Sequence, residues 1–178
     1  MATQSAAWLI KNFWNFFKHY LIDKEVLIHE FNEIQGSGHD YVWSLLQDCL
    51  ATNAKQFESG RIDERTFYQM NSNVYQQMSR FLQEFEKKKS RLLYQSLKEV
   101  NQIMADRFDE DLKGYEVFSV NCCPACDADD IKALTVEEAL AHAESIPTRC
   151  ANTYNRGCMI SYLILNDDNP YHRKKVQP

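Results

Sequence analysis

The stretch DERTFYQMNSNVYQQMSRFLQEFEKKKSRLLYQSLKEVNQIMADRFD, residues 63–109, decides the fold class of this chain. Apolar residues recur in it at every third or fourth position, from Phe67 to Phe85 and again from Leu92 to Phe108. That spacing gives an α-helix one apolar face. The polar run between the two stripes leaves two arrangements open: one helix more than about 60 Å long, or two helices that meet near Lys89.

The residues before this stretch also follow a helical pattern. We expect helices over residues 5–22, 24–34 and about 40–57, because two glycine-containing breaks, near residues 36–38 and 58–60, separate them. The apolar spacing is closer to 3.6 residues than to a strict heptad, so it favours a helical bundle over a long coiled coil. A homo-oligomer built along residues 63–109 is a further interpretation.

The helix expected at residues 5–22 carries an unusually wide aromatic face, which includes Trp8, Phe13 and Phe17. Packing against the following helices is the interpretation that we favour. The alternative is a helix that lies in a membrane interface, where Trp and Phe side chains are favoured. Only two lysines, Lys11 and Lys18, stand on the polar face, and this small number weakens the membrane alternative.

The pattern changes after Gly114. Alternating β-formers predict strands at residues 115–120 and 159–165. Between them, Thr135 and Glu138 form a capping box, which predicts a short helix that ends before Pro147. The sequence therefore predicts a mainly α fold with two domains. Residues 1–113 are a helical bundle domain, and residues 114–178 are a small cysteine-rich α+β module, zinc-ribbon-like, with a basic tail.

Four cysteines of this module form the candidate site. Cys123 and Cys126 stand in a Cys-Pro-x-Cys turn, whose spacing aims two sulfurs at one ion, while Cys150 and Cys158 supply a second pair. Zinc prefers four thiolates in a tetrahedron, so we predict a structural Zn²⁺ site on these residues. Cys122 is an alternative to Cys123, and His142 is an alternative to one of the sulfurs.

Two other interpretations of the cysteines stay open. The spacing of Cys123 and Cys126 also fits a disulfide or a redox dithiol. The other interpretation is that the cysteines are free thiols that bind no metal. The acidic run Asp127, Asp129 and Asp130 is expected to disfavour thiolates, and Arg149 and Arg156 to offset this in part.

The same residues carry a resemblance to a known family. Cys123-Pro-Ala-Cys126, a short helix, Pro147-Thr-Arg-Cys150 and Gly157-Cys158 before a strand resemble the cysteine-rich C-terminal module of phage head-morphogenesis (minor head) proteins and their bacterial relatives. The resemblance covers about residues 115–165. It implies a structural or assembly role. The family pattern ends in Cys-x-Cys, whereas Met159 and Ile160 follow Cys158 here.

Composition and missing motifs narrow the function. A net charge of −5 makes nucleic acid an improbable partner, and the basic residues at 87–91 and 173–175 are expected to be solvated. We find no phosphate loop and no hydrolase or metalloprotease motif, and no small-molecule substrate is apparent. No signal peptide or transmembrane helix is recognised, so we expect a cytoplasmic protein; secretion without a signal, or a place in a phage particle, stays open.

We therefore expect a non-enzymatic interaction or assembly protein with a protein partner or a second copy of itself. A membrane-associated protein or secreted effector anchored by residues 5–22 is one alternative, and a thiol-disulfide redox protein that uses Cys123 and Cys126 is the other.

Overall fold

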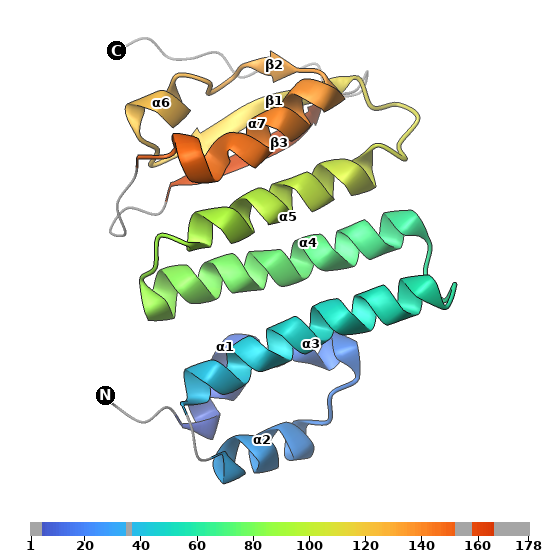
Figure 1. The fold of residues 1–178 in the computed structure, drawn as a ribbon, viewed down its shortest axis with the longest axis vertical. Coiled ribbons are helices and arrows are strands. Elements are labelled where there is room, and N and C mark those ends of the chain that lie inside the picture. Colours follow the sequence, from blue (N-terminus) through green and yellow to red (C-terminus); the bar gives the residue numbers. More distant parts are fainter. Residues whose placement is uncertain (1–4, 35–36, 152–157, 166–178) are drawn as a thin grey trace. The chain divides into compact units, whose positions relative to one another are not determined.

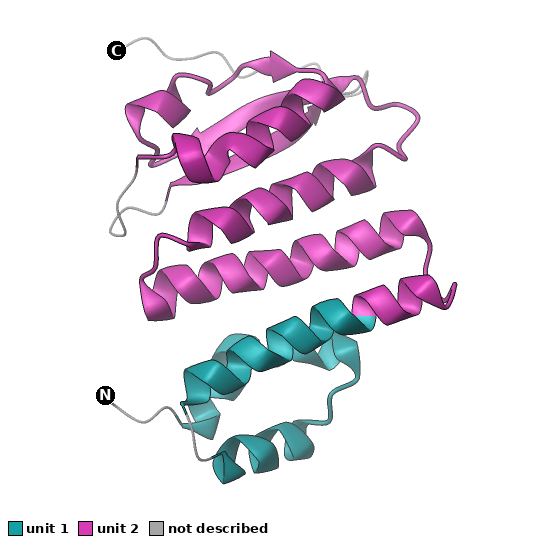
Figure 2. Cartoon of the chain, in the orientation of Figure 1, with its two compact units in different colours: residues 1–52 teal, residues 53–178 magenta. Residues whose placement is uncertain are grey.

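The computed structural model describes residues 5–34, 37–151 and 158–165. Within these ranges the chain forms seven α-helices and one small three-stranded antiparallel sheet near its C-terminal end (Figure 1). The predicted fold class, mainly α with a small α+β part, is confirmed. The chain divides into two compact units, residues 1–52 and residues 53–178, and the division falls inside the helix α3 (Figure 2).

Unit 1 is helical, as the sequence predicts. Its elements are α1 (Ala6–Phe17), a 3₁₀ turn (Lys18–Tyr20), α2 (Lys24–Glu33) and most of α3 (Gly38–Glu58). Ser5 caps α1 and Asp23 caps α2 with side-chain oxygens that accept backbone N–H bonds.

The aromatic face of α1 is partly buried. Leu9, Phe13 and Phe17 have no exposed surface, and the ring of Trp8 lies 5.5 Å from that of Phe13, in an edge-on contact. This burial agrees with packing inside the protein, while binding of residues 5–22 to a membrane stays a prediction. Among the helices of the described ranges, none combines the length and the apolar content that a membrane span needs.

After the last residues of α3, unit 2 continues with a helical hairpin. It consists of α4 (Glu64–Phe81), a π-helical turn (Leu82–Glu86) and α5 (Arg91–Asp106). Of the two arrangements that the sequence leaves open, the structure has two helices. Lys87 takes a left-handed conformation with φ of 53°, and this conformation ends the first helix. Hydroxyl groups tie the two helices together, because Ser72 Oγ donates to the Lys98 carbonyl at 3.0 Å and Ser79 Oγ to the Arg91 carbonyl at 3.1 Å.

The sheet has the order β2-β1-β3, and both pairings are antiparallel. Its strands are β1 (Gly114–Val120), β2 (Ala133–Leu134) and β3 (Met159–Leu165). The structure has the two strands that we predicted, with β1 one residue longer. The sequence analysis missed β2, because two residues are too few to show an alternating pattern.

Helix α7 (Val136–Arg149) covers one face of the sheet. Both halves of the predicted capping box are present: Glu138 N–H donates to Thr135 Oγ1 at 3.2 Å, and Thr135 N–H donates to Glu138 Oε2 at 2.9 Å. The predicted end of this helix was wrong, because Pro147 lies inside it. The proline removes only its own N–H donor from the helix. The helix continues past it, and the N–H of Cys150, three residues later, still bonds to the Ile146 carbonyl at 3.1 Å.

The core of unit 2 joins the hairpin to the sheet. Leu92 and Ile103 of α5 belong to one buried cluster with residues of the sheet and α7, among them Tyr115, Ile146 and Ile160. The domain boundary that we predicted near residue 113 stays a prediction. The two compact units divide elsewhere, between residues 52 and 53.

Candidate metal centre

The first pair of cysteines lies where the chain leaves the sheet. Asn121, directly after β1, has a φ of 54° and turns the chain toward a short helix, α6 (Pro124–Asp127). Cys123 is the N-cap residue of this helix, and its carbonyl accepts the N–H groups of Cys126 at 3.0 Å and Asp127 at 2.9 Å. Pro124 fits the first helical turn, where an N–H would have no partner. Cys126 is fully buried and Cys123 is half-buried.

The second pair comes from two other elements. Cys150 is the C-cap residue of α7, and Cys158 directly precedes β3. Both are buried, with 2% and 1% of their surface exposed. The candidate ligands therefore come from three places in unit 2: the start of α6, the end of α7 and the start of β3.

Three of the sulfurs converge. The Sγ atoms of Cys123, Cys126 and Cys150 all lie within 4.8 Å of one another. In a tetrahedral site with Zn–S distances of about 2.3 Å, neighbouring sulfurs are about 3.8 Å apart, so a small contraction would place these three around one ion. The cluster is thus able to hold a metal.

The fourth ligand stays a prediction. Cys158 is not one of the three convergent sulfurs, but its thiol interacts with those of Cys150 and Cys122. Cys122 in turn donates weak bonds, both 3.4 Å long, to the carbonyls of Val120 and Met159. Five sulfurs thus form a connected group, and Cys150 is the member of the convergent three that interacts with Cys158, which in turn interacts with Cys122.

The two thiols of the Cys-Pro-x-Cys turn differ in acidity. Burial raises the pKa of Cys126 to about 12, and the neighbouring thiols of Cys123 and Cys150 add to this effect. For Cys123 the effect of burial is outweighed by backbone N–H groups, chiefly that of Cys126, which lower its pKa to about 7. Cys123 is therefore the more acidic thiol of the pair.

The effect that we expected from the acidic run stays a prediction, because the main causes that set the pKa of Cys123 are burial and hydrogen bonds, and no carboxylate is among them. Asp129, one member of this run, pairs with Arg149 and lies 3.4 Å from His142 Nε2. Arg149 also donates to the Ala125 carbonyl at 3.1 Å, so it fixes the end of α7 beside α6. Arg156, the other expected counter-charge, lies outside the described residues.

His142 has a different role from the ligand role that we considered. Its Nδ1 lies 2.7 Å from the hydroxyl of Tyr162 and its Nε2 faces Asp129, so both ring nitrogens already have partners. It is also not one of the convergent ligand atoms. The ring joins α7 to β3 and to the loop after α6.

Arg91 is a site residue that the sequence analysis missed. We expected it to be solvated with the basic residues before it, yet only 2% of its surface is exposed. Its Nη1 donates to the carbonyl of Cys158 at 3.2 Å, and no carboxylate of the described ranges pairs with it. The polar run around residue 91 hid this position, because periodicity does not distinguish a buried cation from a solvated one.

No protein-family model, curated protein or solved structure matches the chain. Arguments about its function therefore start from the geometry of unit 2.

Proposed function

We propose that the chain is a non-enzymatic assembly protein whose C-terminal part is held together by a structural zinc ion. The observation that carries the zinc proposal is the convergence of Cys123, Cys126 and Cys150 within 4.8 Å. Cys158 would complete the tetrahedron. Zinc binding contributes about 10–16 kcal/mol in small zinc modules, which is as large as the whole stability of an ordinary domain, about 5–15 kcal/mol.

Arg91 supports an anionic centre at this place. A buried guanidinium that lacks a carboxylate partner costs free energy. Zinc with four thiolates carries a net charge of −2. Arg91 would lie beside this group, because it donates a hydrogen bond to the carbonyl of Cys158, the proposed fourth ligand. The metal centre would thus supply the counter-charge that Arg91 lacks within the described part of the chain.

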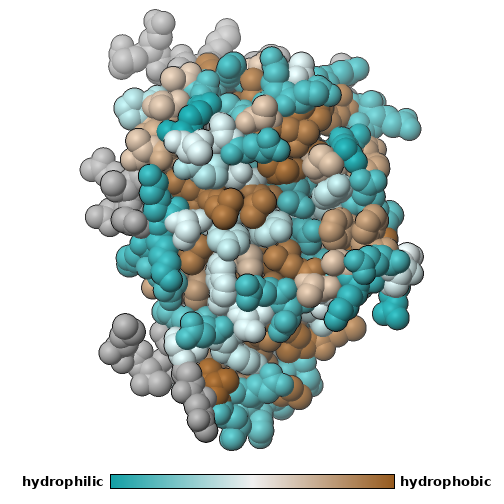
Figure 3. Space-filling view, in the orientation of Figure 1, coloured by the Kyte–Doolittle hydropathy of each residue, from teal (hydrophilic) through white to brown (hydrophobic). Residues whose placement is uncertain are grey.

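The assembly role is the more general part of the proposal. On the face seen in Figure 3, hydrophobic residues over α4 and α5 form separate small patches among hydrophilic ones. Four large apolar side chains of unit 2 are between 40% and 47% exposed: Leu93, Phe108, Met159 and Leu163. Exposed apolar patches favour contact with a protein partner or a second copy. The resemblance to phage head-morphogenesis proteins points to the same class of role.

Elemental analysis tests the zinc site. We expect one zinc per chain after purification without added metal, and none in Cys126→Ser or Cys150→Ser. Cys49→Ser is the matched control, because Cys49 is a buried thiol of unit 1 and should leave the zinc content unchanged. A wild-type protein without zinc that also fails to take up Co²⁺ would reject the metal centre.

A thiol-disulfide exchange activity is the second candidate, and the unequal acidity of Cys123 and Cys126 favours it. The Cys123 thiolate would attack a substrate disulfide and form a mixed disulfide. Cys126 would then displace the second substrate thiol, so that the substrate is reduced and the Cys123–Cys126 pair is oxidised. Insulin reduction by the zinc-free protein, lost in Cys123→Ser, would support this candidate. Absence of turnover with a supplied dithiol reductant would dismiss it.

A further inference from the structure

Cys122 is a fifth sulfur beside the proposed zinc centre, and the four ligands of that centre do not include it. The residue is partly exposed, whereas Cys126, Cys150 and Cys158 have 2% of their surface exposed or less. It follows Asn121, whose left-handed backbone bends the chain directly after β1. Cys122 is thus a thiol that solvent reaches and that the proposed zinc ion leaves uncoordinated.

The bend brings the sulfur of Cys122 to the start of β3. In the register of the sheet, Val120 at the end of β1 pairs with Met159 at the start of β3. The Sγ atom of Cys122 donates to the carbonyls of both residues, each at 3.4 Å. The sulfur therefore lies between the two strand ends, beside the residue that precedes Met159, which is Cys158.

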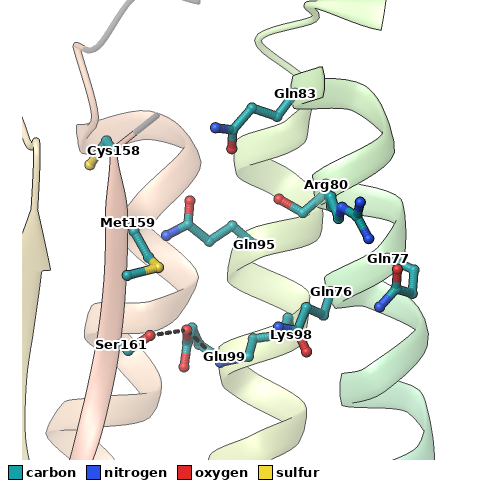
Figure 4. A pocket seen from close by; sticks show the side chains of 11 residues that line it. Gln76, Gln77, Arg80, Gln83, Gln95, Lys98, Glu99, Cys158, Met159 and Ser161 are labelled. Carbon is teal, nitrogen blue, oxygen red and sulfur yellow. Dashed lines mark hydrogen bonds and ion pairs between the residues drawn. The ribbon is translucent and has the colours of Figure 1, made fainter. Parts of the chain in front are cut away.

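Cys158 has sulfur partners on two sides. It lines one end of a pocket where α4, α5 and β3 meet, and its sulfur is directed away from the side chain of Gln95 (Figure 4). Its thiol is hydrogen-bonded to those of Cys150 and Cys122, while Arg91 holds its carbonyl at 3.2 Å. A rotation of the Cys158 side chain is therefore enough to move its sulfur between the convergent cysteines and Cys122.

We propose that Cys122 and Cys158 form a redox switch for the zinc centre, in which a disulfide between them removes the fourth ligand and releases the ion. The inference rests on the proposed function, since it needs a bound zinc ion to release. The two states exclude each other, because zinc is held by thiolates and a sulfur in a disulfide is no longer one.

The oxidant is a hydroperoxide such as hydrogen peroxide. Cys122 gives its proton to water and its sulfur attacks a peroxide oxygen, so that the O–O bond breaks and a sulfenic acid and water form. The Cys158 thiolate then leaves the zinc ion and attacks the sulfenic sulfur; the S–S bond forms and hydroxide departs. The peroxide gains two electrons and the two cysteines lose two.

Two properties of the switch follow from this chemistry. Burial raises the pKa of the Cys122 thiol, so its thiolate is scarce at neutral pH and sustained rather than brief oxidation is needed. A dithiol reductant such as dithiothreitol returns both thiols by exchange and so restores the zinc site.

Peroxide treatment of the zinc-loaded full chain tests the proposal. A zinc-responsive dye follows release, and tryptic digestion without reductant maps the disulfide. Trypsin cleavage places Cys122 in peptide 114–132, Cys150 in peptide 150–156 and Cys158 in peptide 157–173. We expect zinc release together with a link between peptides 114–132 and 157–173 that fragmentation assigns to Cys122, and we expect dithiothreitol to restore zinc binding.

Variants separate the switch from the metal centre. Cys122→Ser should keep one zinc per chain and release it at least about tenfold more slowly under peroxide, and Cys122→Ala is a second variant without a hydroxyl. Cys49→Ser, which removes a buried thiol of unit 1, should respond as the wild type does.

The outcomes are distinguishable. The switch is overturned if the folded Cys122 variants release zinc as fast as the wild type, if they hold no zinc, which would make Cys122 a ligand, or if the mapped disulfide joins other cysteines. In each of these cases the wild type still contains zinc. A wild type without zinc would instead reject the metal centre and the switch with it. The mapped disulfide decides if neither variant folds.

Discussion

Gly114→Ala should destabilise unit 2 far more than a glycine replacement without steric conflict. Gly114 begins β1 with a φ of +146°, a conformation that L-residues rarely adopt. A Cβ atom built there would lie 2.4 Å from the carbonyl oxygen of Leu134 and 3.4 Å from its carbonyl carbon. Because these are backbone atoms of β2, no side-chain rotation relieves the contact.

Two contributions set the magnitude. Holding a non-glycine residue in a rare conformation costs about 1–3 kcal/mol, and forcing an extra carbon into packed structure costs about 1–3 kcal/mol more. We therefore expect the free energy of unfolding to fall by about 2–6 kcal/mol. The pairing of Tyr115 with Leu134 is where the chain would yield, since it is one of only two pairs between β1 and β2.

Gly60→Ala is the matched control. Gly60 also has a positive φ, +69°, but nothing lies within 4 Å of a Cβ built on it. It should pay only the conformational term, about 1 kcal/mol. Urea unfolding followed by circular dichroism measures both variants. Equal losses for the two would refute the steric argument and the close approach of β1 to β2 on which it rests.

Three further predictions follow from buried groups. Asn71→Leu removes the partner of the fully buried Asn53, whose Nδ2 donates to Asn71 Oδ1 at 2.9 Å, and should lower the free energy of urea unfolding by about 1–3 kcal/mol. Replacing both residues by leucine should recover most of this loss, and no recovery would contradict the pairing. Burial raises the pKa of Glu99 above its ordinary value of 4.5, so the folded state binds the carboxyl proton more tightly than the unfolded state does. The free energy of unfolding should therefore decline as the pH rises from 4.5 through the pKa of the folded state, and the urea midpoints of Glu99→Gln should lack this decline. A chelator should lower the thermal midpoint of the wild type but not of Cys150→Ser, and identical responses in calorimetry would count against the metal centre.

The helices were predictable because their signals are local. Asp63 caps α4 by accepting the Thr66 N–H at 2.7 Å, as an Asp before an apolar periodic run suggests. The choice between one long helix and a hairpin was not predictable in the same way. It depends on a left-handed turn at Lys87, a residue type with no marked preference for that conformation, and on the pairing of α4 with α5.

The cysteines of the candidate site could be predicted from the sequence, whereas the residues that surround them could not. The Cys-Pro-x-Cys turn identified Cys123 and Cys126, and Cys150 does join them. The burial of Arg91 and of Glu99 escaped prediction, because both residues lie on helix faces that also carry ordinary polar residues. Their significance comes from β3, which is distant in sequence and packs beside α5.

The order of the strands has a consequence for synthesis on the ribosome. β1 is the middle strand, and its long partner β3 follows roughly 40 residues later, a delay of about 2–8 s at ordinary rates of translation. During this interval the α4–α5 hairpin is complete, but one edge of β1 has no strand beside it and is open to pairing with other nascent chains. A chaperone that covers this edge on the nascent chain would therefore be expected to raise the yield of correctly folded protein, whereas a pause in translation near the end of α7 would lengthen the exposure and lower the yield.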